Sequence, residues 1–202
     1  MNEVEKMRHV FPLVSYNENL KKRMGKGVIL MMNKLILRQL SSDEEANLLC
    51  EEYIRRFPWY HSDYFTTCLL ENREGKRVSL MAMYEGKLAG CCHLLYESAY
   101  PHFKDANIPE INDLSVFPAF RRNKIASTLL DELERMASER SRWVGLGVGL
   151  YQDYGNAQMM YNKRGYVMDG KGITYQNIQV NPGQSVIVDD DLLIYLVKDL
   201  SK

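Results

Sequence analysis

One stretch of the chain, from Asn112 to Ala137, constrains the fold more than any other: NDLSVFPAFRRNKIASTLLDELERMA. It consists of a short apolar strand, a proline, a cluster of cationic residues and an amphipathic helix. In the helix, Ile125, Leu129 and Leu133 recur at the spacing of one helix face, and most charged residues lie elsewhere. A strand that passes through a short turn into a helix is typical of proteins that layer helices on a sheet.

Strands and helices alternate along the rest of the chain without a repeating unit, which predicts a single α/β domain with a mixed sheet flanked by helices. Strands are expected at 35–38, 77–84, 88–96, 111–117, 143–151, 166–168 and 192–197, and helices at 41–54, 63–70, 125–140 and 156–165. Ser42 and Glu45 resemble a capping box, and residues 85–87 indicate a hairpin turn. We expect Asn156 to cap the last helix and Gly165 to end it.

The composition excludes several classes of protein. Lys+Arg and Asp+Glu number 26 each, so the chain lacks the basic excess of a dedicated nucleic-acid surface. The four cysteines form no C-x-x-C pair, which favours buried reduced thiols, and the four histidines lack the spacing of metal ligands. No apolar run is long enough to span a membrane. We therefore expect a cytoplasmic protein with no metal and no nucleic-acid or membrane partner.

The first 31 residues differ from the rest, because NENLKKRMGKGVILMM shows no clear periodicity. One hypothesis is a start codon assigned too early, since residues 26–28 can be encoded by a sequence that resembles a ribosome-binding site just before Met31. The alternative is a genuine but poorly ordered N-terminal arm. A peptide from residues 2–25 in the native protein would refute the first. Either way, we expect an extension over 1–31 and a domain over 32–202.

The basic turn, Arg121 to Ser127, lies where a helix is expected to begin. The first N–H groups of a helix have no partner within it and carry the positive end of the helix dipole, so they suit an anion. The turn can therefore bind a phosphate, or it can be only a charged corner of the surface.

The sequence resembles the GNAT superfamily of N-acetyltransferases over about residues 34–170. The run Arg121-Arg122-Asn123-Lys124-Ile125-Ala126 resembles the family's [Arg/Gln]-x-x-Gly-x-[Gly/Ala] turn, whose N–H groups hold the pyrophosphate of acetyl-CoA. Lys124 replaces the central glycine, which would cost on the order of 1 kcal/mol if the position required a positive φ. Because Ile125 and Ala126 already follow the helix pattern, we expect Lys124 to be helical and to cost little.

A second match spans Asn156 to Tyr166, NAQMMYNKRGY, and keeps the family's spacing of Asn156, Tyr161, Gly165 and Tyr166. The resemblance implies that Asn156 contacts the cofactor and that Tyr161 is the general acid. The alternative for Tyr161 is a core residue whose hydroxyl is satisfied within the protein.

The resemblance implies transfer of an acetyl group from acetyl-CoA, as co-substrate, to a small-molecule or protein amine by direct attack in a ternary complex. Glu110 lies six residues before Val116, where some family members carry a base. Asp113 is the alternative, and a positioned water could relay the proton. Strict alternation would place Glu110 and Asp113 on opposite faces, so that only one reaches the cleft. Main-chain N–H groups near Val116 would stabilise the oxyanion.

The residues expected to bind the cofactor are Leu114, Val116, Arg121, Arg122, Asn123, Lys124, Ile125, Ala126, Ser127, Asn156 and Tyr161.

A different class of function remains open, a non-catalytic acyl-CoA-binding regulatory module in which Lys124 marks an altered cofactor site. A homodimer is possible. The aromatic residues between Tyr53 and Phe65 either line an acceptor pocket or, as we favour, pack the helices. Gly145, Gly147 and Gly149 lie on one strand face, where we expect the long helix to pack.

Overall fold

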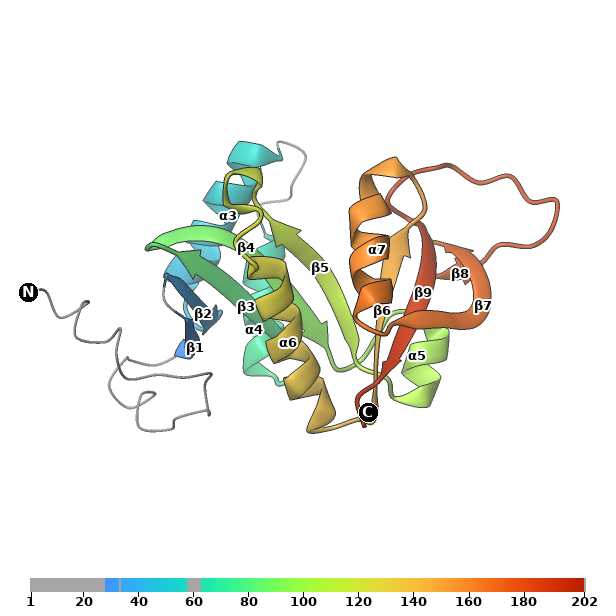
Figure 1. Ribbon diagram of the computed structural model, residues 1–202, viewed down its shortest axis with the longest axis horizontal. Coiled ribbons are helices and arrows are strands. Elements are labelled where there is room, and N and C mark those ends of the chain that lie inside the picture. Colours follow the sequence, from blue (N-terminus) through green and yellow to red (C-terminus); the bar gives the residue numbers. More distant parts are fainter. Residues whose placement is uncertain (1–27, 33, 58–62, 202) are drawn as a thin grey trace, which may run out of the picture.

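A computed structural model describes residues 28–32, 34–57 and 63–201 and shows a single mixed sheet flanked by helices (Figure 1). The strands are β1 (Val28–Met32), β2 (Leu35–Gln39), β3 (Arg77–Tyr84), β4 (Lys87–Leu95), β5 (Glu110–Val116), β6 (Trp143–Gly149), β7 (Val167–Tyr175), β8 (Ile178–Gln179) and β9 (Leu192–Asp199). The helices are α3 (Asp43–Arg56), α4 (Tyr64–Arg73), α5 (Pro101–Ala106), α6 (Ile125–Ser138) and α7 (Gly155–Lys163), with short 3₁₀ turns at Pro118–Phe120 and Gln152–Tyr154. The predicted α/β class is confirmed.

The sheet has the strand order β1-β2-β3-β4-β5-β6-β9-β7-β8, and the direction of strand pairing changes at its centre. Its pairs are antiparallel except for β5 and β6, which are parallel and share a single register position, Glu110 opposite Gly145. Beyond that position the two strands diverge, so that the sheet opens between them (Figure 1). Helices α6 and α7 lie on either side of the opening (Figure 1).

Among the described residues, three clusters of buried hydrophobic side chains pack on the sheet, and the smallest consists of Tyr100, Phe103 and Tyr195. The largest joins Leu129 and Leu133 of α6 and Tyr161 of α7 to apolar side chains of the central strands, such as Leu146 and Val148. The second lies between the pair α3–α4 and the other face of β3 and β4. The apolar stripe of α6 that was evident in the sequence therefore faces the sheet, as predicted.

Most predicted helices and strands are confirmed. At the start of α3, the predicted capping box is formed by local hydrogen bonds. The Ser42 hydroxyl accepts a hydrogen bond from the Glu45 N–H at 3.3 Å, while a Glu45 carboxylate oxygen accepts one from the Ser41 N–H at 2.9 Å. The sequence analysis missed β1, β8, α5 and the length of β7. The short helix α5 has too few residues to show a periodicity, and β7 is interrupted by an irregularity between Met168 and Ile173.

The N-terminal boundary is described only in part. Strand β1 pairs with β2 across the expected division between residues 31 and 32, and residues 1–27 of the expected extension lie outside the described residues. The four cysteines are buried thiols that form no disulfide with one another, as expected. No helix within 28–32, 34–57 and 63–201 combines the length and hydropathy needed to cross a bilayer.

The glycines of β6 pack against aromatic rings, and the expectation that α6 covers them is wrong. A Cβ at Gly145 would lie 2.1 Å from the Phe103 ring, and one at Gly149 would lie 2.4 Å from the Tyr154 ring. Alternation explains the difference, because Val144, Leu146 and Val148 take the face toward α6 and leave the glycines on the other.

Candidate active site

The basic turn lies at the end of β5, beside the opening in the sheet (Figure 1). Lys124 is the N-cap of α6 and is left-handed, with φ 60° and ψ 12°, and Arg122 also has a positive φ of 69°. The expectation that Lys124 is helical is therefore wrong: the helix begins one residue later, at Ile125. The chain keeps the backbone conformation that glycine favours and adopts it with lysine, which costs about 1 kcal/mol.

The backbone of this turn offers a row of hydrogen-bond donors. From Arg122 to Ser127, no N–H group donates a hydrogen bond to any atom in the described part of the chain. The next N–H, that of Thr128, donates to the Lys124 carbonyl at 3.0 Å and so begins the regular ladder of α6. Unpaired N–H groups at a helix start, together with its dipole, favour a bound anion.

The cationic side chains of the turn differ in their roles. Arg121 is turned back onto the strand, where its Nε donates to the Val116 carbonyl at 3.3 Å. Arg122 and Lys124 are exposed and form no ion pair within residues 34–57 and 63–201. Asn123 is used inside the protein: it accepts from the Tyr84 hydroxyl at 3.1 Å and donates to the Phe120 carbonyl at 3.0 Å. Two cations therefore remain available to a ligand.

The main chain of β5 is directed toward the opening at Val116. The Phe117 N–H donates to the Ala89 carbonyl on β4 at 2.8 Å. Because successive N–H groups of a strand point in opposite directions, the Val116 N–H points away from β4 and toward the opening. This is the position at which the sequence analysis expected a donor for the oxyanion. The side chains of Leu114 and Val116 pack against the α6 core.

Tyr161 projects from α7 into the largest of the three clusters, where it is 7% exposed. Its hydroxyl forms no hydrogen bond with a described residue, which argues against a core tyrosine with a satisfied hydroxyl. Burial raises the pKa of Tyr161, and the nearby Cys92 raises it further, so the hydroxyl keeps its proton at neutral pH.

Asn156 does not cap α7, contrary to expectation. The helix begins at Gly155 with Tyr154 as its N-cap and no side-chain cap, and Asn156 is an exposed residue of the first turn. The predicted helix end is confirmed, since Gly165 follows the last turn with φ 87°. The predicted contact of Asn156 with the cofactor stays a prediction.

Glu110 lies at the foot of the opening, opposite Gly145, and is 5% exposed. Its carboxylate accepts hydrogen bonds from the Ser98 hydroxyl and from the Asn112 amide. Burial raises the pKa of Glu110, and these two hydrogen bonds offset part of the rise. A buried carboxylate with a raised pKa is suited to accept a proton.

Glu110 and Asp113 lie on the same face of β5, so the expectation of opposite faces is wrong. An irregularity in the pairing of β4 with β5 between Cys91 and His93 adds a residue to β5, and Asp113 takes φ 50° there. The bulge turns Asp113 toward α4, where the Tyr64 hydroxyl donates to its carboxylate. On the same side, the Asn112 amide donates to Glu110.

Sequence reasoning missed the residues that hold these two carboxylates. Ser98 belongs to a loop without a motif, and Asn112 and Asp113 stand in a bulge that leaves no mark in the pattern of apolar residues. Tyr64 was grouped with the aromatic residues of the helices. The expectation that these aromatic residues pack the helices is confirmed for Tyr53 and Phe65, which are buried. Tyr64 in addition donates a hydrogen bond to Asp113. Residues 58–62 lie outside the described residues.

The opening between β5 and β6, the donor row of the turn and the carboxylates on β5 form one candidate site with room for an anionic ligand at the turn. The family model for acetyltransferases of the GNAT family matches residues 44–166, more than half of the chain. The chain therefore belongs to the GNAT family of acetyltransferases, as the sequence resemblance implied.

Solved structures share this fold at low sequence identity. An acetyltransferase from Salmonella typhimurium that modifies the N-terminal serine of the ribosomal protein L7/L12 is 12% identical, with a TM-score of 0.61 over 83% of this chain and 96% of that one. An aminoglycoside 6′-N-acetyltransferase in complex with coenzyme A is 16% identical, with a TM-score of 0.56 over 82% and 97%.

A spermidine N-acetyltransferase chimera from Vibrio cholerae and hSSAT is 13% identical, with a TM-score of 0.58 over 83% of this chain and 96% of that one. No match was found among curated proteins. Within the described ranges, no group of three or more histidine, cysteine, aspartate or glutamate side chains is arranged to hold a metal ion.

Proposed function

We propose that the protein transfers the acetyl group of acetyl-CoA to a primary amine by direct attack within a ternary complex. The observation that carries this proposal is the row of N–H groups from Arg122 to Ser127 that donate no hydrogen bond in the described structure, beside the opening between β5 and β6. Membership of the GNAT family supports the acyl donor.

The turn would bind the pyrophosphate of acetyl-CoA through its N–H groups, and Arg122 and Lys124 would add charge attraction. Ile125, Ala126 and Ser127 contribute their backbone, since the side chain of Ile125 is buried. The positive φ of Arg122 and Lys124 supports this role, because alternating backbone conformations of this kind let successive N–H groups converge on an anion. The arm that carries the thioester would then follow the inner edge of β5 toward Glu110.

Proton removal from the acceptor is the first chemical requirement, because a free alkylamine has a pKa of about 10.4 and is mostly protonated at neutral pH. Glu110 is our candidate for the base, acting directly or through a water, since its buried carboxylate has a raised pKa. Asp113 is exposed and lies on the same face, so it can attract the cationic amine before Glu110 takes the proton.

Acetyl transfer forms one bond, C–N, and breaks one bond, C–S. The amine nitrogen attacks the thioester carbon and forms the C–N bond, and the Val116 N–H stabilises the oxyanion. Glu110 passes the proton that it took from the ammonium group to solvent, and Glu110 or its water then takes the second proton from the nitrogen. The C–S bond breaks, and Tyr161 donates a proton to the departing thiolate. Solvent returns that proton to Tyr161. The absence of a hydrogen-bond partner for the Tyr161 hydroxyl among described residues supports this role.

The acceptor stays at the level of a primary amine, in a small molecule or a protein. The names of structural neighbours include enzymes for an aminoglycoside, for spermidine and for a protein N-terminus, so the shared fold does not select among them. The pair of carboxylates on one face of β5 favours an acceptor that carries a positive charge before reaction. Homodimer formation stays a prediction.

The second candidate is an acyl-CoA-binding regulatory module without catalysis. One observation favours it: Arg122 and Lys124 hold left-handed conformations without glycine, which indicates a cofactor turn that has departed from the family pattern. It predicts acetyl-CoA binding without turnover.

Calorimetric titration with acetyl-CoA tests the cofactor site. We expect micromolar binding that weakens at least tenfold in Arg122→Ala/Lys124→Ala. The matched control is Lys76→Ala/Lys104→Ala, which removes two exposed lysines whose side chains are 65% and 58% exposed and paired with exposed glutamates. No binding by the folded protein, or equal weakening by both double variants, would refute the site.

Turnover tests the chemistry. Tyr161→Phe should lower kcat for a primary-amine acceptor, or for slow hydrolysis of acetyl-CoA, by about 10²-fold or more while acetyl-CoA affinity is retained. An unchanged kcat at saturating substrates would reject Tyr161 as the acid. Binding of acetyl-CoA without turnover of any amine would favour the regulatory module.

A further inference from the structure

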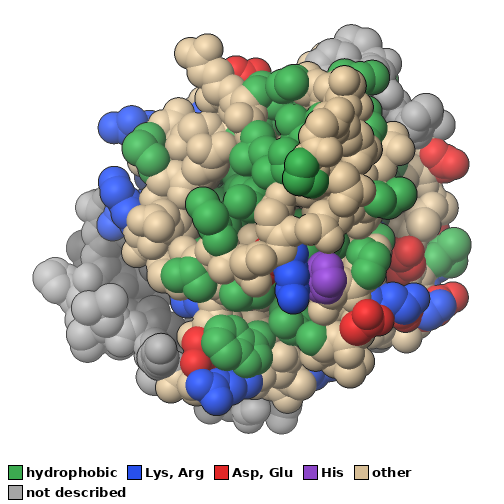
Figure 2. Space-filling view, turned by 90° about the vertical axis from the view of Figure 1, so that its right-hand side faces the viewer, with side chains coloured by type: hydrophobic (Ala, Val, Ile, Leu, Met, Phe, Trp, Pro, Cys, Tyr) green, Lys and Arg blue, Asp and Glu red, His purple; other side chains and the backbone are tan. Residues whose placement is uncertain are grey.

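A pocket of about 550 Å³ lies on the side of the C-terminal strands that faces away from α6 and α7. It is formed by α5, the first residue of β6, the start of β7 and the end of β9. Figure 2 views the molecule from this side and shows hydrophobic side chains gathered there, with few charged side chains between them. No residue of the basic turn or of α7 lines the pocket, so it is separate from the proposed cofactor site.

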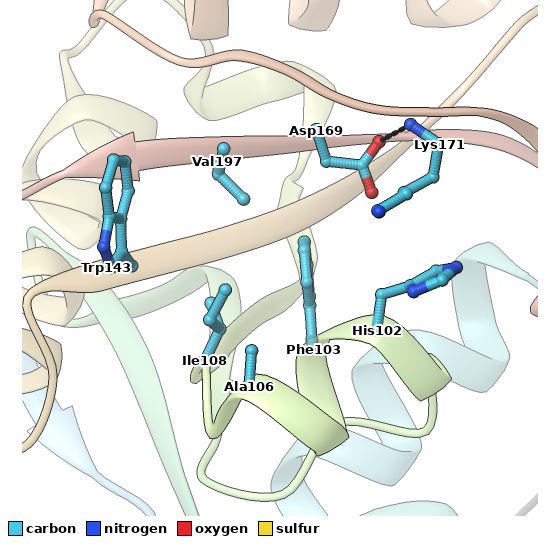
Figure 3. A pocket seen from close by; sticks show the side chains of 8 residues that line it. All are labelled: His102, Phe103, Ala106, Ile108, Trp143, Asp169, Lys171 and Val197. Atoms are coloured by element: carbon cyan, nitrogen blue, oxygen red, sulfur yellow. Dashed lines mark hydrogen bonds between the residues drawn. The ribbon is translucent and has the colours of Figure 1, made fainter.

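One end of the pocket is apolar. Trp143, Ile108, Val197 and Phe103 line it from four segments of the chain, and Figure 3 shows Trp143 at the end farthest from the charged residues. The Phe103 ring is held by edge contacts to its aromatic neighbours and by Gly145 beneath it, while Trp143 keeps 37% of its surface exposed. A rigid aromatic wall of this size suits a ring or a branched apolar group.

The other end carries charge, as Figure 3 shows for Asp169, Lys171 and His102. The Asp169 carboxylate is already engaged, because it accepts from the Tyr100 hydroxyl at 2.8 Å and from the Lys171 N–H at 2.9 Å. The ammonium group of Lys171 forms no ion pair with a carboxylate in the described ranges. The Lys171 ammonium group is therefore available to a ligand, because Asp169, the only carboxylate that lines the pocket, is already hydrogen-bonded to other groups.

The main chain fixes this arrangement. Met168 and Ile173 of β7 pair with Leu196 and Ile194 of β9, so the residues between them form a long bulge over the pocket. Gly170 and Gly172, with φ 79° and 80°, allow the bulge to turn sharply on each side of Lys171. The sequence pattern DGKG therefore places one lysine at the rim of an apolar pocket.

We propose that this pocket binds a small organic carboxylate with an aromatic or branched apolar body. The body would lie against Trp143 and Phe103, and the carboxylate would accept hydrogen bonds from Lys171 and from a ring N–H of His102. The volume falls in the range of small-molecule sites, roughly 300–1,000 Å³. Binding here would not require the acetyl-transfer chemistry.

Trp143 provides a direct reporter, because the chain has two tryptophans and the other, Trp59, can be replaced by phenylalanine. In Trp59→Phe, 3-phenylpropionate is titrated while tryptophan emission is followed. The matched ligands are 3-phenylpropanamide, which keeps the body without the charge, and acetate, which keeps the charge without the body. Calorimetry on the unsubstituted protein repeats the titration, so the test stands even if Trp59→Phe does not fold.

We expect a saturable change in Trp143 emission with 3-phenylpropionate, at least fivefold weaker affinity for the amide, and no saturation with acetate. Lys171→Gln should weaken carboxylate binding at least threefold, whereas Lys76→Gln, an exposed lysine elsewhere, should leave it unchanged. Equal affinity for acid and amide, or no saturable signal by either method, would overturn the proposal. So would emission that depends on protein concentration together with self-association in sedimentation, because the pocket would then be an interface between copies.

Discussion

Replacing Lys124 by glycine should separate two effects that this residue combines. Its left-handed backbone is strained, and its exposed side chain carries a positive charge at the proposed pyrophosphate site. A residue with a Cβ pays about 1–2 kcal/mol in this conformation, whereas glycine adopts it freely. Glycine also gains more freedom in the unfolded chain, which offsets roughly 0.5–1 kcal/mol. We therefore expect Lys124→Gly to raise the free energy of unfolding by about 0.5–1 kcal/mol.

Thermal unfolding followed by circular dichroism, without acetyl-CoA, measures this gain. A change of 1 kcal/mol shifts the Tm of a domain of this size by about 2–4 °C, so an increase of roughly 1–4 °C is expected. Lys124→Ala is the matched variant, because it loses the charge but keeps the strain. Its Tm should stay near that of the parent protein.

The two Lys124 variants should differ in stability but resemble each other in their affinity for acetyl-CoA. If the ammonium attracts phosphate, Lys124→Gly and Lys124→Ala should bind acetyl-CoA more weakly by a similar factor of about 2–5, and added salt should reduce the difference. Equal Tm values for the glycine and alanine variants would refute the claim of strain. Tighter binding by the glycine variant would mean that backbone fit outweighs the charge.

Three further predictions test the scaffold and its pH response. Gly145→Ala places a Cβ 2.1 Å from the Phe103 ring and should lower the free energy of unfolding by about 1–3 kcal/mol in urea titrations. Glu134→Gln removes the buried charge that joins α6 to Arg164, the C-cap residue of α7, at 2.9 Å and should cost about 2–3 kcal/mol by the same assay. Burial lowers the pKa of His93 to about 4 from 6.5, so the unfolded chain binds more protons between these values. The protein should therefore lose stability as the pH falls from about 6.5 to 4, by up to about 3 kcal/mol, and His93→Asn should flatten this slope in urea titrations across pH.

Each of these predictions has a clear contrary result. Gly155→Ala is the control for Gly145→Ala, since a Cβ there would meet no atom within 4 Å, and equal losses in both would deny the steric argument. An unchanged urea midpoint in Glu134→Gln would show that the buried pair adds nothing to stability. If His93→Asn keeps the full loss of stability toward pH 4, the acid sensitivity arises from other groups.

The sequence predicted the scaffold well where local signals agree. The stripe of α6 and the cap of α3 are local patterns, and they appeared where the residues placed them. Site geometry was harder, because it depends on backbone that side-chain patterns do not show. The bulge at Asp113 reverses the face of one carboxylate, and the left-handed Lys124 shifts the start of a helix by one residue.

Residues far apart in the chain were the other difficulty. The hydrogen bond from Ser98 to Glu110 and that from Tyr64 to Asp113 form only when the sheet and α4 are assembled, and neither donor belongs to a motif. The sequence analysis correctly assigned the glycines of β6 to packing, but it named α6 as their partner, whereas aromatic rings lie against them. Phe103 lies in a helix too short to be recognised, so no sequence pattern could place its ring over Gly145.

The divergence of β5 and β6 means that this sheet has four edges instead of two. Two of them lie inside the molecule, where strands that pair only at Glu110 and Gly145 expose main-chain groups to the gap between them. An edge on the outside of a protein invites pairing with other chains. These inner edges are flanked by α6 and α7 and do not lie at the outer margins of the sheet (Figure 1). Under the proposed function, the amide groups of the coenzyme A arm would pair with these edges as a short additional strand would.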